Sequence, residues 1–304
     1  MIVDSNGTII SHNNKPKNLQ MIMSDIRLRL LDSGSVFDAI LDIQLLEKLS
    51  SFELGKFLLA NKGLNGYWTD YILTYPRKEK CFNISDFEKT ILERLPTFCA
   101  TQQRFNIFLN LNQQQVKDNA KLASIPSGLG GELFYLDLAS HSNIELYLID
   151  LDNNSLESAK FVAKTKSIKQ NINYIQENAW SIDFKTKFDL ISSNGLTIYE
   201  PDDKKIIELF EKFYKALNPR GLLVTSTLTP PPSIDNNSEW DMTKVSTDML
   251  RLQKKLFSDI IQVNWQCYRS SKKITEMLKL IGFEDITITY DLAKIFPTIS
   301  ARKI

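Results

Sequence analysis

The sequence has 304 residues, 43% of them hydrophobic, and a formal net charge of +1 at pH 7. A chain of this length can build one large domain or two smaller ones, and its balanced charge gives no general attraction to nucleic acid or to an anionic membrane. No apolar run approaches the roughly 18 residues that span a bilayer, and the N-terminus lacks the pattern of a signal peptide. We therefore expect a soluble cytoplasmic protein without a nucleic-acid or membrane partner.

Cysteines and histidines are few and scattered. The three cysteines are far apart and odd in number, which suits a reducing compartment, and neither histidine is close to a cysteine in the sequence. We therefore predict no disulfide framework and no metal site. These residues are Cys81, Cys99, Cys267, His12 and His141.

Residues 1–117 have the pattern of an all-α N-terminal domain. After a polar, loose start over Met1–Pro16, apolar residues recur at helical spacing across 18–61 and again across 83–110, with one interruption at a proline. Ser51 is the predicted N-cap of the third helix. Such a domain could act as a lid, contact a substrate or form a homodimer.

The segment between these helical stretches is rich in aromatic residues. Tyr67, Tyr71 and Tyr75 are spaced at i, i+4 and i+8, which places them on one face of a helix, and Trp68 lies beside them. Two interpretations are open: core packing between helices, or an aromatic wall against a bound substrate. On the second interpretation Tyr67, Trp68 and Tyr71 contact the substrate.

After residue 118 strand patterns alternate with helical patterns, which predicts a parallel sheet with helices on both faces. The predicted strands cover residues 121–127, 144–150, 172–180, 188–196 and 221–228, followed by two tightly joined strands within 286–303. The predicted helices cover residues 131–140, 154–165, 201–219 and 272–283. Asn154 or Ser155 is the expected cap of the second of these helices.

The central feature of this half is a glycine turn between the first strand and the helix after it. Gly128, Gly130 and Gly131 allow a close approach of the backbone, and exposed N–H groups at the start of a helix bind polar or anionic groups. A strand, a glycine turn and a helix in this order are typical of a site for a nucleotide-like ligand. Pro126 and Ser127 lead into the turn.

Polar residues at the ends of the next strands support this interpretation. Asp150 ends the second strand, where a carboxylate can accept hydrogen bonds from ribose hydroxyls; a helix cap or a solvated acid is the alternative. Asn178 and Ala179 follow the third strand, where an amide oxygen could accept a hydrogen bond from an adenine amino group. Trp180 beside them could equally belong to the core.

The fourth strand ends where the reacting centre is expected. Asn194 and Thr197 could orient a substrate, and Tyr199 and Glu200 could act on its proton. We predict Asn194 and Tyr199 as the catalytic residues.

A long insertion, residues 230–271, follows the fifth strand. We expect it to cap the substrate, with Trp240 and Tyr268 in contact with it; packing against the N-terminal helices is the alternative. Arg104, from the N-terminal helices, could pair with a cofactor carboxylate or form a surface salt bridge.

These features together resemble the class I S-adenosylmethionine-dependent methyltransferases over residues 118–304. The resemblance rests on the glycine turn Ser127-Gly128-Leu129-Gly130-Gly131, Asp150, Asn178-Ala179, the strand 188–196, the helix-to-strand phrase 215–226 and the closing strand pair. It implies a Rossmann-like, mostly parallel seven-stranded sheet with one reversed strand, S-adenosylmethionine as cofactor and S-adenosylhomocysteine as product. The cofactor-binding residues that it implies are Pro126, Ser127, Gly128, Gly130, Asp150, Leu151, Asn178, Ala179, Trp180 and Ser193.

The chain departs from the family pattern in its first motif. Ser124 and Pro126 stand where the family usually has an acidic residue and a first glycine. The acid commonly orders the amino end of the methionine group, and Pro126 has no N–H to donate.

Three functions follow as hypotheses. The first is methyl transfer to a small-molecule acceptor by in-line displacement, which depends chiefly on holding donor and acceptor in line and needs no metal. The second is an NAD(P)-dependent oxidoreductase, disfavoured because Leu133 stands where its fingerprint has a third glycine. The third is a non-catalytic module that binds S-adenosylmethionine.

Overall fold

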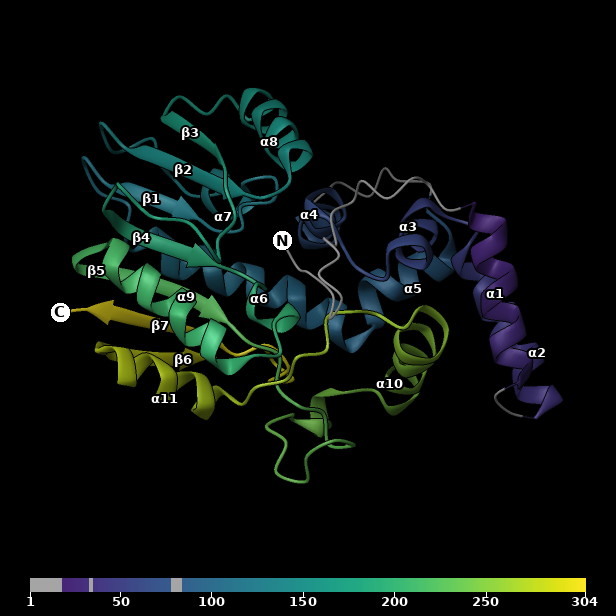
Figure 1. Cartoon of the computed structure of the whole chain (residues 1–304). Coiled ribbons are helices and arrows are strands. Elements are labelled where there is room, and N and C mark those ends of the chain that lie inside the picture. Colours follow the sequence, from purple (N-terminus) through teal and green to yellow (C-terminus); the bar gives the residue numbers. More distant parts are fainter. Residues whose placement is uncertain (1–17, 33–34, 78–83) are drawn as a thin grey trace.

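The C-terminal part of the chain is built on a seven-stranded sheet, and the N-terminal helices lie beside it (Figure 1). The computed structural model describes residues 18–32, 35–77 and 84–304. The strand order is β3-β2-β1-β4-β5-β7-β6, and β7 runs opposite to the other six strands. The strands are β1 (Lys121–Ser124), β2 (Glu145–Asp150), β3 (Asn171–Gln176), β4 (Phe188–Ser193), β5 (Leu217–Ser226), β6 (Phe283–Thr289) and β7 (Thr298–Lys303). The predicted Rossmann-like sheet with one reversed strand is confirmed.

Helices cover both faces of the sheet, because buried strands carry apolar residues on both sides. Along β2, Leu146 and Leu148 point to one face, while Tyr147 and Ile149 point to the other. The first face packs against α6 (Pro96–Gln113), α7 (Gly131–Phe134) and α8 (Asn153–Thr165), and the second against α9 (Asp203–Ala216) and α11 (Ser271–Ile281).

The helix after the glycine turn is much shorter than predicted. The sequence pattern predicts a helix over residues 131–140, but α7 is a single turn. Its place on the sheet is taken by α6, whose Phe105 and Phe108 pack with Leu133 and Phe134 in one cluster. A helix from the N-terminal part therefore completes the cover of this face.

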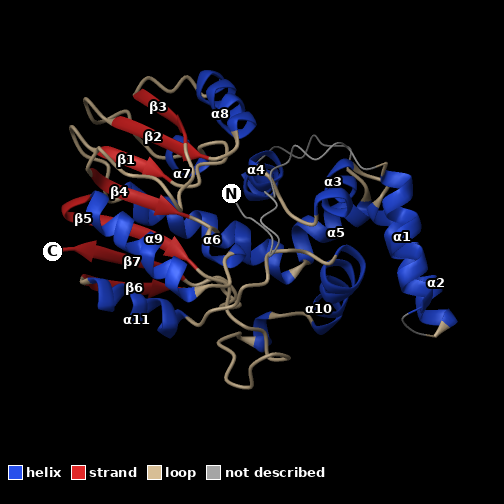
Figure 2. Ribbon diagram, in the orientation of Figure 1, coloured by secondary structure: helices blue, strands red, loops and turns tan. Residues whose placement is uncertain are grey.

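The N-terminal part is helical throughout its described residues (Figure 2). Its helices are α1 (Leu19–Asp32), α2 (Val36–Leu49), α3 (Glu53–Asn61), α4 (Gly66–Thr74), α5 (Asp86–Arg94) and α6, and a 3₁₀ turn over Tyr75–Arg77 follows α4. The loose start expected over Met1–Pro16, together with His12 and Cys81, lies outside the described residues. The division into domains at residue 117 stays a prediction.

Two predicted helix caps are wrong. The N-cap of α3 is Phe52, without a side-chain hydrogen bond, rather than Ser51. The N-cap of α8 is Asp152, whose side chain accepts a hydrogen bond from the N–H of Asn154. The predicted caps lie one to three residues from the observed ones. Several residues of types that often cap helices stand side by side in these segments, so the sequence alone does not fix the first turn.

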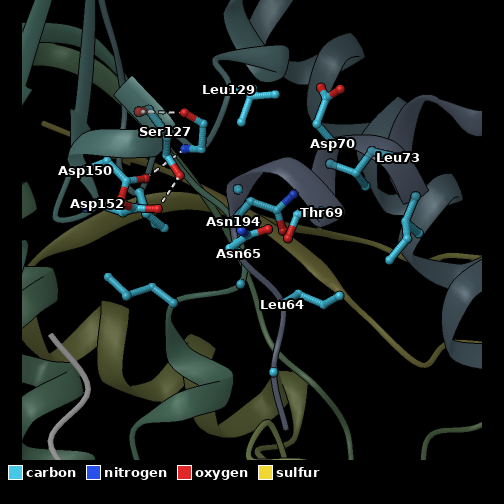
Figure 3. A pocket seen from close by; sticks show the side chains of 18 of the residues that line it. Leu64, Asn65, Thr69, Asp70, Leu73, Ser127, Leu129, Asp150, Asp152 and Asn194 are labelled. Atoms are coloured by element: carbon cyan, nitrogen blue, oxygen red, sulfur yellow. Dashed lines mark hydrogen bonds between the residues drawn. The ribbon is translucent and has the colours of Figure 1, made fainter. Parts of the chain in front are cut away.

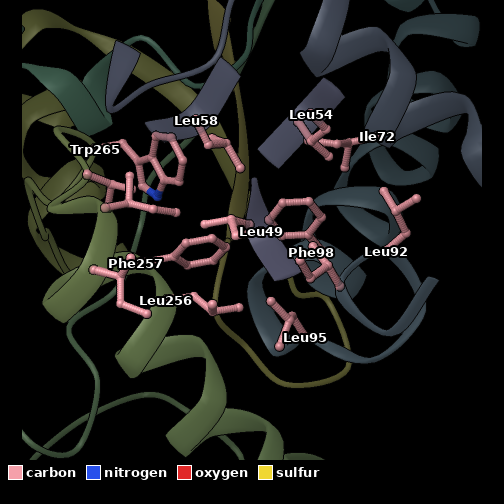
Figure 4. Close-up of a cluster of buried hydrophobic side chains, with 14 of the residues drawn as sticks. Leu49, Leu54, Leu58, Ile72, Leu92, Leu95, Phe98, Leu256, Phe257 and Trp265 are labelled. Carbon is pink, nitrogen blue, oxygen red and sulfur yellow. The ribbon is translucent and has the colours of Figure 1, made fainter. Parts of the chain in front are cut away.

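The insertion packs largely against the N-terminal helices, which is the alternative to a cap over the substrate. Its helix α10 (Thr247–Lys254) continues as a π-helical segment, Lys255–Ile261. Leu256 and Phe257 belong to the same apolar cluster as Leu49 and Phe98 of the N-terminal helices (Figure 4). The insertion therefore joins the helical part, and only the segment after its helix, with Trp265, reaches the cavity described next.

Within the described residues, no helix combines the length and the apolar character that crossing a membrane requires.

Candidate active site

A cavity of about 710 Å³ opens at the carboxyl ends of the parallel strands. The strand edge supplies one wall, with Ser127 and Asp150, and α4 supplies another, with Thr69 and Asp70 (Figure 3). The volume is in the range of pockets that enclose most of a small molecule. The position is the one at which wound α/β sheets bind ligands.

The glycine turn forms one corner of this cavity. Gly128 and Gly130 have φ angles of 50° and 79°, a region that favours glycine. A Cβ on Gly130 would lie 2.5 Å from side-chain atoms of both Leu148 and Phe134. Position 130 therefore tolerates no side chain without displacing the core behind the turn.

The amides of this turn are not bare, which corrects the prediction that they bind the ligand directly. The N–H of Gly128 donates to Oδ2 of Asp150 over 2.8 Å, and the N–H of Gly130 donates to the carbonyl of Ser127 over 2.8 Å. The turn closes on itself because both donors find partners nearby. Of the turn, Gly128, Leu129 and Gly131 line the cavity.

Asp150 is held in place by backbone donors on both sides. Besides the bond from Gly128, its Oδ1 accepts the N–H of Asp152 over 2.9 Å. Burial raises the pKa of Asp150, while these two bonds act in the opposite direction. The carboxylate thus has a fixed orientation on the cavity wall, and its second lone pairs can accept hydrogen bonds from a ligand.

The first turn of α4 closes over the glycine turn. A Cβ on Gly66 would lie 3.1 Å from the Cα of Gly128 and 2.4 Å from Oγ of Ser155. The N-cap of this helix is Asn65, whose side chain accepts the N–H of Trp68 over 3.0 Å. A helix of the N-terminal part therefore forms part of the lid of the cavity.

The predicted cofactor residues fall into three groups. Pro126, Ser127, Gly128, Asp150 and Leu151 line the cavity. Asn178, Ala179 and Trp180 line an adjoining hollow of about 50 Å³, which shares Pro126, Asp150 and Leu151 with the cavity. Gly130 and Ser193 are not on either lining.

The amide of Asn178 is already engaged within its own turn. Its Oδ1 accepts the N–H of Trp180 over 3.1 Å. The hollow that Asn178 lines has the position expected for the base of a nucleoside whose ribose lies at Asp150.

Both predicted catalytic residues line the cavity. Asn194 follows β4, and its Oδ1 accepts the hydroxyl of Ser226 over 3.2 Å. Tyr199 lies in a 3₁₀ turn, Thr197–Tyr199, and burial raises its pKa to about 12. Tyr199 is therefore a neutral hydrogen-bond donor at neutral pH and not a base.

None of the five predicted substrate residues lines the cavity. The face of α4 that lines it carries Thr69, Asp70, Ile72 and Leu73, so Tyr67, Trp68 and Tyr71 point elsewhere. The hydroxyl of Tyr71 donates to Glu88 over 3.0 Å, and the side chains of Trp68 and Tyr71 pack against the helical core. Core packing, the alternative interpretation, describes these two residues.

The aromatic candidates of the insertion are also away from the cavity. Nε1 of Trp240 donates to the hydroxyl of Thr229 over 3.0 Å, and the ring is buried. Tyr268 packs on the same apolar cluster and pairs through its backbone with Leu228. The aromatic residues that do line the cavity include Phe98, Trp265 and Phe296.

Two buried charged residues, Glu132 and Arg104, lie on the cavity wall, and the sequence pattern does not predict that they meet there. The sequence pattern does not mark Glu132 as a site residue, and a surface salt bridge is one of the two roles expected for Arg104. Their exposed fractions are 7% and 6%. An acid directly after Gly131, the last glycine of the turn, is a signal that could have pointed to Glu132.

Among the described residues, no group of histidine, cysteine or acidic side chains could hold a metal ion.

Comparisons with known proteins support a family assignment. A family model described as "Methyltransferase domain" matches residues 117–282. A crystal structure from Bordetella parapertussis, described as a possible exported protein, is 35% identical with a TM-score of 0.89, and the match covers 100% of this chain and 99% of that one. No curated protein matches the sequence.

A more distant structure shares the fold alone. The magnesium protoporphyrin IX methyltransferase from Synechocystis PCC 6803, solved with bound S-adenosylhomocysteine, is 13% identical with a TM-score of 0.52. The match covers 78% of this chain and 99% of that one.

Proposed function

Because this chain belongs to the class I S-adenosylmethionine-dependent methyltransferases, we propose that it methylates a small-molecule acceptor held in the cavity at the strand edge. S-adenosylmethionine is its cofactor. The observation that carries the proposal is a cavity whose lining includes the glycine turn and Asp150 together with Asn194 and Tyr199. Donor and acceptor fit side by side in such a cavity.

The residues around the glycine turn suit the nucleoside of the cofactor. Asp150 offers oriented acceptor lone pairs to ribose hydroxyls, and the hollow beside Asn178 offers space for the adenine. When bound, the cofactor supplies a methyl group on a cationic sulfur, which is open to attack by an acceptor. The chain's part is then to hold both reactants in line, which can contribute as much as about 7–11 kcal/mol to lowering a barrier.

Asn194 and Tyr199 suit the positioning of the acceptor. Tyr199 keeps its proton at neutral pH and can donate a hydrogen bond, while the amide of Asn194 is oriented by Ser226. The adjacent wall is largely apolar, with Phe98, Trp265 and Phe296 among its residues. This lining favours an acceptor with an apolar or aromatic body.

The lining of the cavity supports a small acceptor. Besides the strand edge, α4, α6 and the segment with Trp265 contribute to it, so a small molecule can contact several elements at once. The family assignment also leaves the oxidoreductase hypothesis without support. Cytoplasmic location, a homodimer and the absence of a nucleic-acid partner stay predictions.

The test begins with binding and ends with turnover. We expect S-adenosylhomocysteine, and not NAD or NADP, to raise the melting temperature and to release heat in titration calorimetry. The protein is then incubated with S-adenosylmethionine and either the low-molecular-mass or the macromolecular fraction of a cell extract. Formation of S-adenosylhomocysteine only with the small-molecule fraction supports the proposal.

Other outcomes separate the alternatives. Turnover only with the macromolecular fraction would overturn the small-molecule acceptor. Tight binding with no turnover in any fraction would favour the non-catalytic module. A Tyr199→Phe variant should lose about 2–10-fold in kcat/KM, the worth of one hydrogen bond, while Tyr67→Phe, whose ring is 54% exposed and off the cavity, should lose none.

A further inference from the structure

Two buried side chains of opposite charge line the cavity without forming an ion pair. Glu132 lies in the first turn of α7 and Arg104 lies on α6. Among the described residues, neither takes part in a salt bridge, although each is close enough to influence the other's charge. A buried charge without a partner costs several kcal/mol. A ligand that places an opposite charge beside each side chain would therefore stabilise both.

The carboxylate of Glu132 is held at the edge of β4 by neutral groups. The hydroxyl of Ser192 donates to it, and the side chains of Asn194 and Ser124 lie beside it. Ser124 is the residue that stands in place of the family's usual acid. Glu132, on the helix after the glycine turn, therefore places a carboxylate beside Ser124, where most members of the family have an acidic residue.

The guanidinium of Arg104 is only partly satisfied. Its Nη1 donates to Ser226 over a long 3.3 Å, and its carbon lies 4.2 Å from the centre of the Phe296 ring. Its Nε is buried and has no hydrogen-bond partner in the described structure. Arginine presents its donors in a planar fork that matches a carboxylate.

Asn194 lies between the two charges. It is beside Glu132, and its Oδ1 accepts the hydroxyl of Ser226, which in turn accepts from Arg104. Two opposite charges set apart on one cavity wall complement a zwitterion, and an α-amino acid group carries an ammonium and a carboxylate on one carbon.

We propose that Glu132 binds the ammonium and Arg104 the carboxylate of the methionine group of the cofactor. This rests on the proposed function, because it requires that S-adenosylmethionine binds at the strand edge. The pair explains how the chain tolerates Ser124: the acid has moved to α7, and a cation from the N-terminal helices completes the receptor. The N-terminal part is then a component of the cofactor site.

Calorimetry with two product-like ligands tests the pair. S-adenosylhomocysteine carries the amino acid group, whereas 5′-methylthioadenosine keeps the nucleoside and thioether but lacks that group. We expect Glu132→Gln and Arg104→Gln each to raise the Kd of S-adenosylhomocysteine by about 10–100-fold, the usual worth of a charged hydrogen bond. The Kd of 5′-methylthioadenosine should stay within about twofold.

Glu88→Gln is the matched control for Glu132→Gln. Glu88 is also a buried glutamate, with an exposed fraction of 7%, but it lies on α5 and bonds to Tyr71 away from the cavity. Its substitution should leave both Kd values unchanged. Should Arg104→Gln fail to fold, the wild-type protein still provides a test, because it should bind S-adenosylhomocysteine at least tenfold more tightly than 5′-methylthioadenosine.

The possible failures are distinguishable. A wild-type protein that binds neither ligand refutes the proposed function itself. Folded variants that bind S-adenosylhomocysteine as tightly as the wild type refute the receptor alone. If Arg104→Gln keeps this affinity but loses turnover with an acceptor, then Arg104 binds a carboxylate of the acceptor, and its assignment to the cofactor is wrong.

Discussion

Replacing Asp150 by Asn probes the nucleoside end of the site. In the wild type, the two carboxylate oxygens accept the N–H groups of Gly128 and Asp152 over 2.8 and 2.9 Å. An asparagine can accept only one of these bonds, and its NH₂ group must face the other donor. The substitution therefore removes the negative charge and loosens the glycine turn at the same time.

The expected loss of affinity follows from these contacts. A hydrogen bond to a charged group contributes about 1.5–3 kcal/mol, which corresponds to a roughly 10–150-fold increase in Kd. Because burial raises the pKa of Asp150, a neutral side chain is less costly to bury there than a charged one. We therefore expect the free energy of unfolding to change by less than about 2 kcal/mol, so that weak binding does not merely reflect unfolding.

Titration calorimetry with S-adenosylhomocysteine measures the effect, and urea unfolding measures stability. Asp183→Asn is the control, since Asp183 is exposed and pairs only locally with Lys185. Its Kd should equal that of the wild type. A folded Asp150→Asn protein with an unchanged Kd would show that the ribose does not lie at this carboxylate.

Three further predictions concern stability. Gly130→Ala should cost roughly 1–3 kcal/mol more than Gly195→Ala in urea unfolding, because both have φ near 80° but only at position 130 would the new Cβ meet other atoms; equal losses would refute the close packing behind the turn. Burial raises the pKa of Glu132, so its protonated side chain is favoured in the folded state. Its contribution to the free energy of unfolding is therefore full below the ordinary pKa of about 4.3 and is lost as the pH rises through the raised pKa. Glu132→Gln should therefore gain melting temperature relative to the wild type at pH 8 more than at pH 4, and a pH-independent difference would contradict this. Phe257→Ala should cost about 3–5 kcal/mol, because the ring is 4% exposed, whereas Phe161→Ala, 72% exposed, should stay within about 0.5 kcal/mol; a small loss at Phe257 would show that the insertion does not share the helical core.

Much of the sheet could be predicted because its signals are local. The run of apolar residues in β2 and the long amphipathic pattern of α9 are each complete within one segment. Proline and glycine punctuation then separates the segments. The expectation of one reversed strand rests on the family resemblance and not on these patterns, and the order of the strands is known only from the structure.

The short α7 shows where local reasoning fails. Residues 131–140 carry a helical pattern, yet α6 occupies the sheet face on which a longer helix would pack. Helix formation in a protein depends more on packing of the apolar face than on propensity. The local pattern of residues 131–140 gives no sign that a helix from another part of the chain covers the same face of the sheet.

The glycine turn, the acid at Asp150 and the position of Asn194 could be predicted from local sequence, because each depends on residues that adjoin one strand. The rest of the site depends on how distant segments pack together. The rotation of α4 directs Asp70 to the cavity and Tyr71 away from it, although the spacing of the tyrosines fits either outcome. The presence of Arg104 and Glu132 on one cavity wall likewise depends on how α6 packs against the sheet, because nothing in the sequence links residues so far apart in the chain.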